Sequence, residues 1–151
     1  MKKAVYHNNI EVANLHPRQK VFLTGIKKLV QKILEGEKRS EKLNIVFVDD
    51  KFIRRLNRKF TKRNLSTDVL SFGMKEGKKI GPRCDILGDV YVNLDQAKKN
   101  AKSFGQRFED EVKLLVTHGI LHLLGYEHKS KKKALFMRKK EDFYLNFKKG
   151  N

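Results

Sequence analysis

The stretch Thr117–His128, with the sequence THGILHLLGYEH, holds three of the five histidines of this chain. His118 and His122 are four residues apart, so their imidazole rings lie on the same face if the stretch is helical. Gly125 stands where a helix ends in a left-handed residue that reverses the chain direction. The short segment after this turn can bring His128 back under the same face. The spacing therefore predicts three imidazole rings that converge on one point.

Three converging neutral imidazoles are typical of a catalytic zinc site, because structural zinc sites normally fill all four positions with protein ligands. We therefore expect one Zn²⁺ per chain on His118, His122 and His128, although three imidazoles also suit nickel, copper or iron. Cys84 is the only cysteine, which excludes an intramolecular disulfide and a cysteine-rich metal cluster. The alternative is a hydrogen-bonded core pair with a surface histidine, which the third histidine and the turn glycine disfavour.

The spacing of the three histidines and the glycine also matches the metzincin metalloprotease pattern. In that pattern a glutamate follows the first histidine and acts as the general base. Gly119 stands in this place and cannot transfer a proton. The residues therefore predict a metal-dependent hydrolase and argue against peptide hydrolysis by the usual route.

Apolar runs elsewhere in the chain predict a sheet. Four strands are expected, at Ala4–Val12, Leu43–Val48, Val69–Phe72 and Leu87–Asn93. The stretch Gly73–Ile86, which contains several glycines, is expected to be a long flexible connection between the last two strands.

Apolar residues at helical spacing predict five helices. One is opened by His16-Pro17 and ended by Gly36, one is capped by Asp49 or Asp50, and three cover Asp95–Ser103, Phe108–Leu124 and Ser130–Phe147. In the second helix, four residues are expected to face inward: Phe52, Ile53, Leu56 and Phe60. No repeat or linker divides the sequence. We expect one domain over residues 1–151, an α+β fold with one central, mostly four-stranded mixed sheet and about five helices.

The charge of the chain points to a polyanionic partner. There are 35 Lys+Arg against 17 Asp+Glu, a formal net charge of +18. Such a field favours nucleic acid first and an anionic membrane second. No apolar run approaches the ~20 residues that span a bilayer, and no apolar stretch of signal-peptide length follows the start MKKAVYHNN. We expect a cytoplasmic protein with no membrane partner, whose function requires no oligomer.

Taken with two upstream stretches, the histidine motif resembles the YbeY family of bacterial metal-dependent endoribonucleases. The family fingerprint, roughly HGxLHLxGYDH, is similar to His118–His128, with Glu127 in the place of the Asp. Upstream, Leu56-Asn57 and Thr67–Phe72 resemble the LN…TDVLSF element of the family, and Leu87–Val92 resembles its LGDI strand. The resemblance covers roughly residues 40 to 130, with the motifs in the right order.

The resemblance implies a zincin-like α+β fold with a three-histidine zinc site. It also implies a single-strand-specific endoribonuclease that matures the 3′ end of 16S ribosomal RNA, in the small ribosomal subunit, and acts in ribosome quality control. A metal ion lowers the pKa of a bound water toward ~7 and polarises a bound electrophile, which suits attack on an RNA phosphodiester. Composition and spacing by themselves only permit an RNA target.

Further residues are candidates for parts of the site. Glu127, next to a ligand, is the nearest candidate for acid–base work, or else an exposed turn residue. Asp68 and Ser71 belong to the motif strand and are candidates for the cleft, although we expect Asp68 to cap a turn. Asp89 is expected to be structural. Basic residues before that strand are expected to hold the RNA backbone: Arg54, Arg55, Arg58, Lys62 and Arg63.

The chain departs from the family pattern at two places. The family usually has an Arg after the aromatic residue that follows the LN pair, whereas Thr61 follows Phe60 here. Either Arg63 takes over the phosphate-facing role or that role is lost. After the third histidine, relatives are commonly acidic, whereas residues 129–133 read KSKKK here. This segment either strengthens non-specific RNA binding or reflects a basic proteome.

Two other functions stay open on the sequence. Another zinc hydrolase, such as a peptidase, can use the same three histidines, although Gly119 counts against it. An RNA-binding ribosome-assembly factor can use the metal only to hold its fold.

Overall fold

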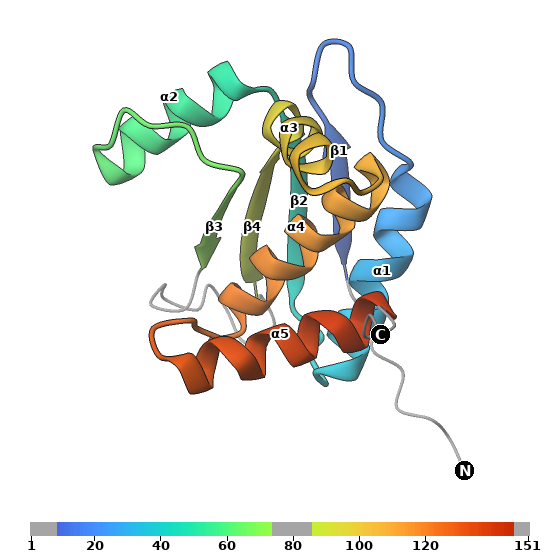
Figure 1. Ribbon diagram of the computed structural model, residues 1–151. Coiled ribbons are helices and arrows are strands. Elements are labelled where there is room, and N and C mark those ends of the chain that lie inside the picture. Colours follow the sequence, from blue (N-terminus) through green and yellow to red (C-terminus); the bar gives the residue numbers. More distant parts are fainter. Residues whose placement is uncertain (1–8, 74–85, 147–151) are drawn as a thin grey trace.

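A four-stranded mixed sheet forms the centre of the protein, whose computed structural model describes residues 9–73 and 86–146 (Figure 1). The strands are β1 (Ile10–Asn14), β2 (Lys42–Val48), β3 (Val69–Gly73) and β4 (Ile86–Asn93). Their order across the sheet is β1-β2-β4-β3. The first three of these strands are parallel, and β3 pairs antiparallel with β4 at one edge. The predicted mixed sheet is confirmed.

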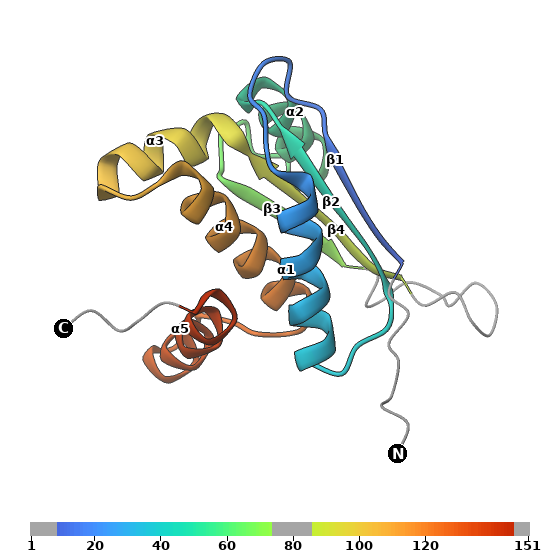
Figure 2. The ribbon, with the colours of Figure 1, turned by 90° about the vertical axis from the view of Figure 1, so that its right-hand side faces the viewer.

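Five helices surround this sheet over the described residues, as expected. They are α1 (Leu23–Gly36), α2 (Asp50–Thr61), α3 (Leu94–Phe104), α4 (Phe108–Leu123) and α5 (Lys131–Leu145). Helices α1 and α4 lie side by side over one face of the sheet, and α5 packs against the ends of both (Figure 2). This arrangement is the predicted α+β fold, and it places the C-terminal end of α4 beside α5.

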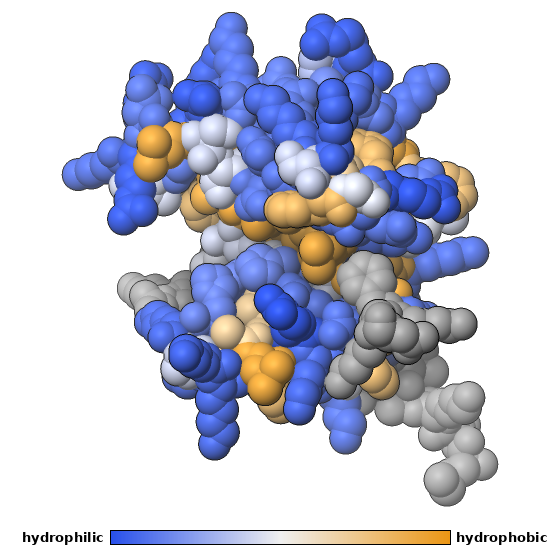
Figure 3. Space-filling view, in the orientation of Figure 1, coloured by the Kyte–Doolittle hydropathy of each residue, from blue (hydrophilic) through white to orange (hydrophobic). Residues whose placement is uncertain are grey.

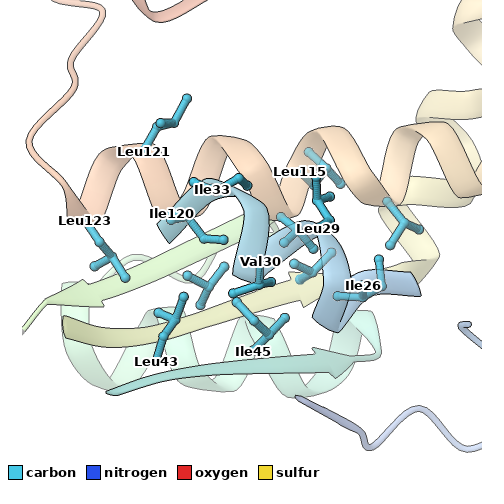
Figure 4. Packing of buried hydrophobic residues seen from close by; sticks show 14 of the residues in the cluster. Ile26, Leu29, Val30, Ile33, Leu43, Ile45, Leu115, Ile120, Leu121 and Leu123 are labelled. Atoms are coloured by element: carbon cyan, nitrogen blue, oxygen red, sulfur yellow. The ribbon is translucent and has the colours of Figure 1, made fainter. Parts of the chain in front are cut away.

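The main core lies between the sheet and the helices α1 and α4 (Figure 4). Alternate residues of β2 point into it, so Leu43, Ile45 and Phe47 are fully buried. They meet Val30 and Ile33 of α1, which are also fully buried. Burying side chains of this size contributes roughly 1.5–3 kcal/mol each. This packing fixes α4 against the sheet, and α4 carries two of the three clustered histidines.

Helix α2 packs against part of the opposite face of the sheet, at β4. Phe52 of α2 stacks on Tyr91 of β4 with 6.1 Å between ring centroids. The neighbour of Tyr91, Val90, lies on the α4 side, because successive residues of a strand point to opposite faces. Helices α2 and α4 are therefore separated by the sheet.

Two expected boundaries near the N-terminus are wrong. The first strand was expected at Ala4–Val12, but β1 starts at Ile10 and runs to Asn14, which pairs with Phe47; residues 4–8 lie outside the described residues. The first helix was expected to open at His16-Pro17, but α1 starts at Leu23. The ring of His16 accepts hydrogen bonds from the backbone N–H groups of residues 18 and 19, at 3.1 and 2.9 Å. This local turn competes with a helix.

The expected inward face of α2 is only partly correct. Ile53 is fully buried, but Phe52 is 37% exposed and Phe60 is 59% exposed. The buried residues of α2 are Ile53 and Asn57, which are one turn apart, so the buried stripe is narrow. Asn57 is buried with its amide donating to the carbonyl of Leu65 at 2.9 Å. The predicted cap is confirmed, since the Asp49 carboxylate accepts a hydrogen bond from the N–H of Phe52.

The remaining boundaries agree closely with expectation, with two qualifications. The stretch Gly73–Ile86 contributes its ends to β3 and β4, and residues 74–85 lie outside the described residues. The last helix was expected to reach Phe147, but α5 ends at Leu145. Asn146 adopts a left-handed conformation there, with φ of 56°, which terminates the helix. Phe147 itself lies outside the described residues.

Candidate metal centre

The end of α4 turns back on itself as its glycine predicts. Gly125 has φ of 99° and donates to the carbonyl of His122 at 3.0 Å. The N–H of Tyr126 donates to the carbonyl of Leu121, also at 3.0 Å. These two bonds form a Schellman motif, which satisfies carbonyls at the helix end and reverses the chain. The reversal carries His128 back to the two histidines of α4.

The three histidine rings converge. Their centroids lie 4.5 Å apart for His118 and His122, 5.0 Å for His122 and His128, and 5.7 Å for His118 and His128. One nitrogen from each ring lies within 4.8 Å of the others. The Nε2 atoms of His118 and His122 are 3.0 Å apart. Zinc binds imidazole nitrogen at ~2.0–2.1 Å, so tetrahedral donors lie roughly 3.4 Å from one another. The group therefore fits a metal ion.

The electrostatics of the group favour neutral imidazoles. Burial lowers the pKa of His122, and the nearby His118 and His128 rings lower it further. A hydrogen bond to the backbone of Tyr126 and the charge of Glu141 act in the opposite direction without reversing the shift. A neutral imidazole has the free lone pair that a metal requires.

Glu141 of α5 orients the first ring of the group. Its Oε2 atom lies 2.7 Å from Nδ1 of His118, and its side chain is only 13% exposed. A hydrogen bond from Nδ1–H to the carboxylate leaves Nε2 of His118 free to face the other two rings. Carboxylates in this position are common behind metal-binding histidines, where they fix the tautomer and raise ligand basicity.

Reasoning from the sequence missed Glu141, because it follows His118 on a different helix. One signal was available. Glu141 lies at helical spacing from Met137 and Tyr144, the two buried residues of α5. An acidic residue on the buried stripe of a lysine-rich helix requires a partner.

A second carboxylate ties the turn to both neighbouring helices. Glu37, directly after α1, accepts hydrogen bonds from the hydroxyl of Tyr126 at 2.6 Å and from Nζ of Lys140 at 3.1 Å. The hydroxyl of Tyr144 donates to the same carboxylate. Burial alone raises the pKa of Glu37, but the bonds from Tyr126, Tyr144 and Lys140 outweigh it and hold the pKa below its ordinary value. The turn before His128 is thereby fixed to α1 and α5.

Gly119 lies where α4 touches the sheet. A Cβ atom at this position would lie 2.5 Å from Cγ1 of Val90 and 3.1 Å from Oγ of Ser71. The hydroxyl of Ser71 donates to the carbonyl of Gly119 at 3.0 Å. The position that carries the general base in metalloproteases therefore points into β3 and β4, with no room for a glutamate. Ser71 of β3 is thus bonded to the residue of α4 that directly follows His118.

Asp68 lies further from the three histidines. Its carboxylate accepts a hydrogen bond from the amide of Asn100 at 3.4 Å. Its charge also reaches Glu111: burial raises the pKa of Glu111, and Asp68 adds to that rise. Glu111 precedes His118 on α4 by two turns, roughly 10 Å along the axis. The structure thus places Asp68 beside the start of α4, whereas the histidines lie at its end.

Glu127 lies in the turn beside His128 and is half-buried. Its carboxylate is 3.5 Å from Nζ of Lys133 and 3.9 Å from Nζ of Lys129. Asp89, expected to be structural, accepts a hydrogen bond from the Asn44 amide across β2 and β4 at 2.8 Å.

The predicted RNA-binding residues lie on and after α2. Arg54 pairs with Asp50 at 2.7 Å. The others are exposed at the helix surface and its end: Arg55, Arg58, Lys62 and Arg63. Arg63 and Thr61 line the same pocket, of about 540 Å³, between the end of α2 and the start of β3. Arg63 is thus beside the position where the family usually has its Arg.

The fold and the site together define a zincin-like α+β protein with three convergent imidazoles that can hold a metal ion. The chain belongs to the endoribonuclease YbeY family, whose sequence model matches residues 9–149. The predicted resemblance is confirmed.

Individual relatives agree with this assignment. The endoribonuclease YbeY of Pelotomaculum thermopropionicum is 39% identical over 141 residues, which cover 89% of this chain and 93% of the relative. That of Syntrophotalea carbinolica is 34% identical and is covered over 97% of its length. The solution structure of TM1509 from Thermotoga maritima is similar with a TM-score of 0.65 and 30% identity, over 91% of this chain and 87% of that one. Within the described residues, no helix is long and apolar enough to cross a bilayer.

Proposed function

We propose that this chain is an endoribonuclease that cleaves single-stranded RNA with a Zn²⁺ ion held by His118, His122 and His128. The convergence of these three rings at the end of α4, in a member of the endoribonuclease YbeY family, is the observation that carries the proposal. The formal net charge of +18 supports an RNA substrate.

The substrate we propose is the 3′ end of 16S ribosomal RNA on the small ribosomal subunit. Membership of the family supports this proposal, and the relatives are named as endoribonucleases. A ribosomal substrate places the protein in the cytoplasm. The chain acts as one domain and needs no oligomer for this reaction.

The residues of the site divide the work. Zinc on three imidazoles supplies a Lewis acid and activates water for attack on a phosphodiester. Glu141 holds Nδ1 of His118, which keeps Nε2 aimed at the centre. Glu127, beside His128, is the proposed group that exchanges a proton through its carboxylate. Its carboxylate lies 3.5 Å from Nζ of Lys133 and 3.9 Å from Nζ of Lys129, in the turn next to His128.

Other residues position the strand. We propose that the cations of α2 hold the RNA backbone, with Arg63 taking the phosphate-facing role beside Thr61. Their exposure and the pocket of about 540 Å³ beside Arg63 support this. Asp68 and Ser71 are proposed to shape the strand and helix around the site, because each makes a hydrogen bond to α3 or α4.

Close packing at Gly119 argues against a peptidase, because the usual glutamate base does not fit there. A ribosome-assembly factor with a structural metal is the alternative that the experiment must separate.

The test is cleavage of a single-stranded fragment of ribosomal RNA by zinc-loaded protein. We expect cleavage by the wild type, none by His122→Ala, and wild-type cleavage by Asp142→Asn, which removes a charge from α5 outside the site. Binding of the RNA without cleavage by metal-loaded wild type would overturn the proposal and favour the assembly factor.

A further inference from the structure

A pocket of about 840 Å³ opens beside α5, on the side of that helix away from His118. We call it the α5 pocket; its walls include Arg39, Gly125, Tyr126, Lys132, Phe136 and Lys139. Lys139 and Glu141 are two residues apart, so they point to opposite faces of α5. Glu141 supports the metal centre. The α5 pocket therefore adjoins the metal centre and shares Glu127 with it, but among the described residues that line it there is no histidine. Its volume is within the size range of small-molecule sites.

An aromatic pair forms the apolar part of the α5 pocket. The rings of Tyr126 and Phe136 stack with 5.7 Å between centroids and 18° between planes. The hydroxyl of Tyr126 is fixed on Glu37, so its ring supports Phe136 from one side. Phe136 is 55% exposed, and apolar side chains show among hydrophilic ones over α5 in Figure 3. An exposed ring held by a second ring is a platform on which a nucleobase can stack.

Cations surround this platform. Lys132 and Lys139 line the α5 pocket, and over residues 9–73 and 86–146 the side chain of neither makes a hydrogen bond or an ion pair. The two carboxylates of the pocket already have partners. Glu37 is bonded to two tyrosines and Lys140, and Glu127 lies near Lys129 and Lys133. The unpaired ammonium groups therefore give the pocket a net attraction for anions.

We propose that the α5 pocket binds one nucleotide of the RNA substrate, with the base stacked on Phe136 and the phosphates held by Lys132 and Lys139. This rests on the proposed function, because the bound nucleotide belongs to the strand that the metal centre cleaves. The turn that joins His122 to His128 forms a wall of the pocket. The chain from Tyr126 to His128 spans at most about 7 Å. A nucleotide seated there is therefore close in the strand to the phosphodiester at the metal.

Charge favours RNA over a protein partner in this pocket. The exposed apolar side chains of α5 are interrupted by lysines at 132, 133 and 139, which a packed protein interface would have to bury. The phosphates of RNA can form ion pairs with these lysines, and a base can stack on a single exposed aromatic ring. The formal net charge of the chain is also positive, at +18.

The test is the affinity of fluorescently labelled single-stranded RNA, with and without zinc, by anisotropy. Phe136→Ala should weaken binding roughly 5- to 150-fold, the range for one base–aromatic stack. The double variant Lys132→Ala/Lys139→Ala should reduce the salt slope by about 1.4. The matched controls lie on α3, where Phe104 is 70% exposed and Lys98 and Lys102 are exposed. Phe104→Ala and Lys98→Ala/Lys102→Ala should bind as the wild type does. Thermal unfolding confirms that each variant is folded.

A photocrosslink gives a direct readout of the contact. RNA that carries 5-iodouridine should crosslink to the peptide that contains Tyr126 or the peptide that contains Phe136. If Phe136→Ala and Phe104→Ala bind RNA equally and no crosslink maps to α5, the proposal is overturned and the pocket suits a protein partner instead. If wild type binds RNA through α5 but never cleaves it, the proposed function fails and the nucleotide site stands.

Discussion

Nδ1 of His118 and Oε2 of Glu141 lie 2.7 Å apart across the contact between α4 and α5. His118 belongs to the predicted histidine motif, whereas Glu141 lies on α5, outside any predicted motif. Their contact makes the placement of α5 part of the metal centre. Glu37 completes this support, because it bonds Tyr126 of the turn and Lys140 of α5 together.

Removing the charge of Glu141 should weaken metal binding without unfolding the protein. Glu141→Gln keeps the size of the side chain but loses the carboxylate charge that faces Nδ1 of His118. We expect zinc affinity to fall about 10- to 100-fold, measured by competition with a chelating dye. Asp142→Asn removes a neighbouring charge on α5 and should change little. Equal zinc affinities for the two variants would contradict the role of Glu141.

Zinc should stabilise the folded protein through the three histidines. A ligand whose free concentration is about 1,000 times its dissociation constant adds about 4 kcal/mol to the free energy of unfolding. Thermal unfolding should therefore shift upward with zinc and downward with a chelator. His122→Ala should lose most of this shift. An unchanged melting temperature after metal is stripped from protein shown to contain it would count against a site within the fold.

A methyl group at position 119 should be costly. Gly119→Ala places Cβ 2.5 Å from Cγ1 of Val90, and overpacking of this kind costs about 1–3 kcal/mol. Denaturant unfolding measures the loss. In a Val90→Ala background the added methyl should cost less, because its nearest neighbour is gone. An equal cost in both backgrounds would show that the strain arises elsewhere.

Glu37 should make stability depend on pH in the acid range. Its pKa is held below the ordinary value, so its contribution is present above the unfolded pKa of about 4.3. That contribution is lost as pH falls through the lower pKa of the folded protein. Glu37→Gln should lower the free energy of unfolding at pH 7 by about 1–3 kcal/mol and flatten its acid dependence. Glu35→Gln, at an exposed position two residues earlier in the last turn of α1, is the control. An unaltered pH profile for Glu37→Gln would refute this assignment.

The cations of α2 should contribute to RNA binding through charge alone. Arg55→Ala/Arg58→Ala should weaken binding of single-stranded RNA similarly for all sequences. The salt slope should fall by about 1.4, since each lost phosphate contact removes ~0.7. Lys27→Ala/Lys28→Ala on α1 serves as the comparison. If the affinity of Arg55→Ala/Arg58→Ala depends on salt as the wild type does, the RNA backbone does not contact these two residues of α2.

The local features of the metal centre follow from the amino-acid sequence alone. His118, His122, Gly125 and His128 predict a helix, a left-handed turn and a convergence of rings, because helical spacing and glycine conformation act over a few residues. The same reasoning predicted the mixed sheet and the helix cap at Asp49. It failed for the start of α1, where His16 bonds locally and to Asp95 at 2.7 Å, a partner distant in the sequence.

The residues that support and surround the metal centre depend on the packing of the whole fold. Glu141, Glu37 and the α5 pocket depend on how α5 packs against α4 and α1, and Gly119 depends on how closely α4 approaches Val90. Such contacts join residues that are far apart in the chain, and their geometry is set by packing of the whole core. Spacing within α5 can place Glu141 on the buried side of that helix, but no spacing within one element identifies its partner on another. The ligands could therefore be predicted from the sequence, and their contacts with other elements could not.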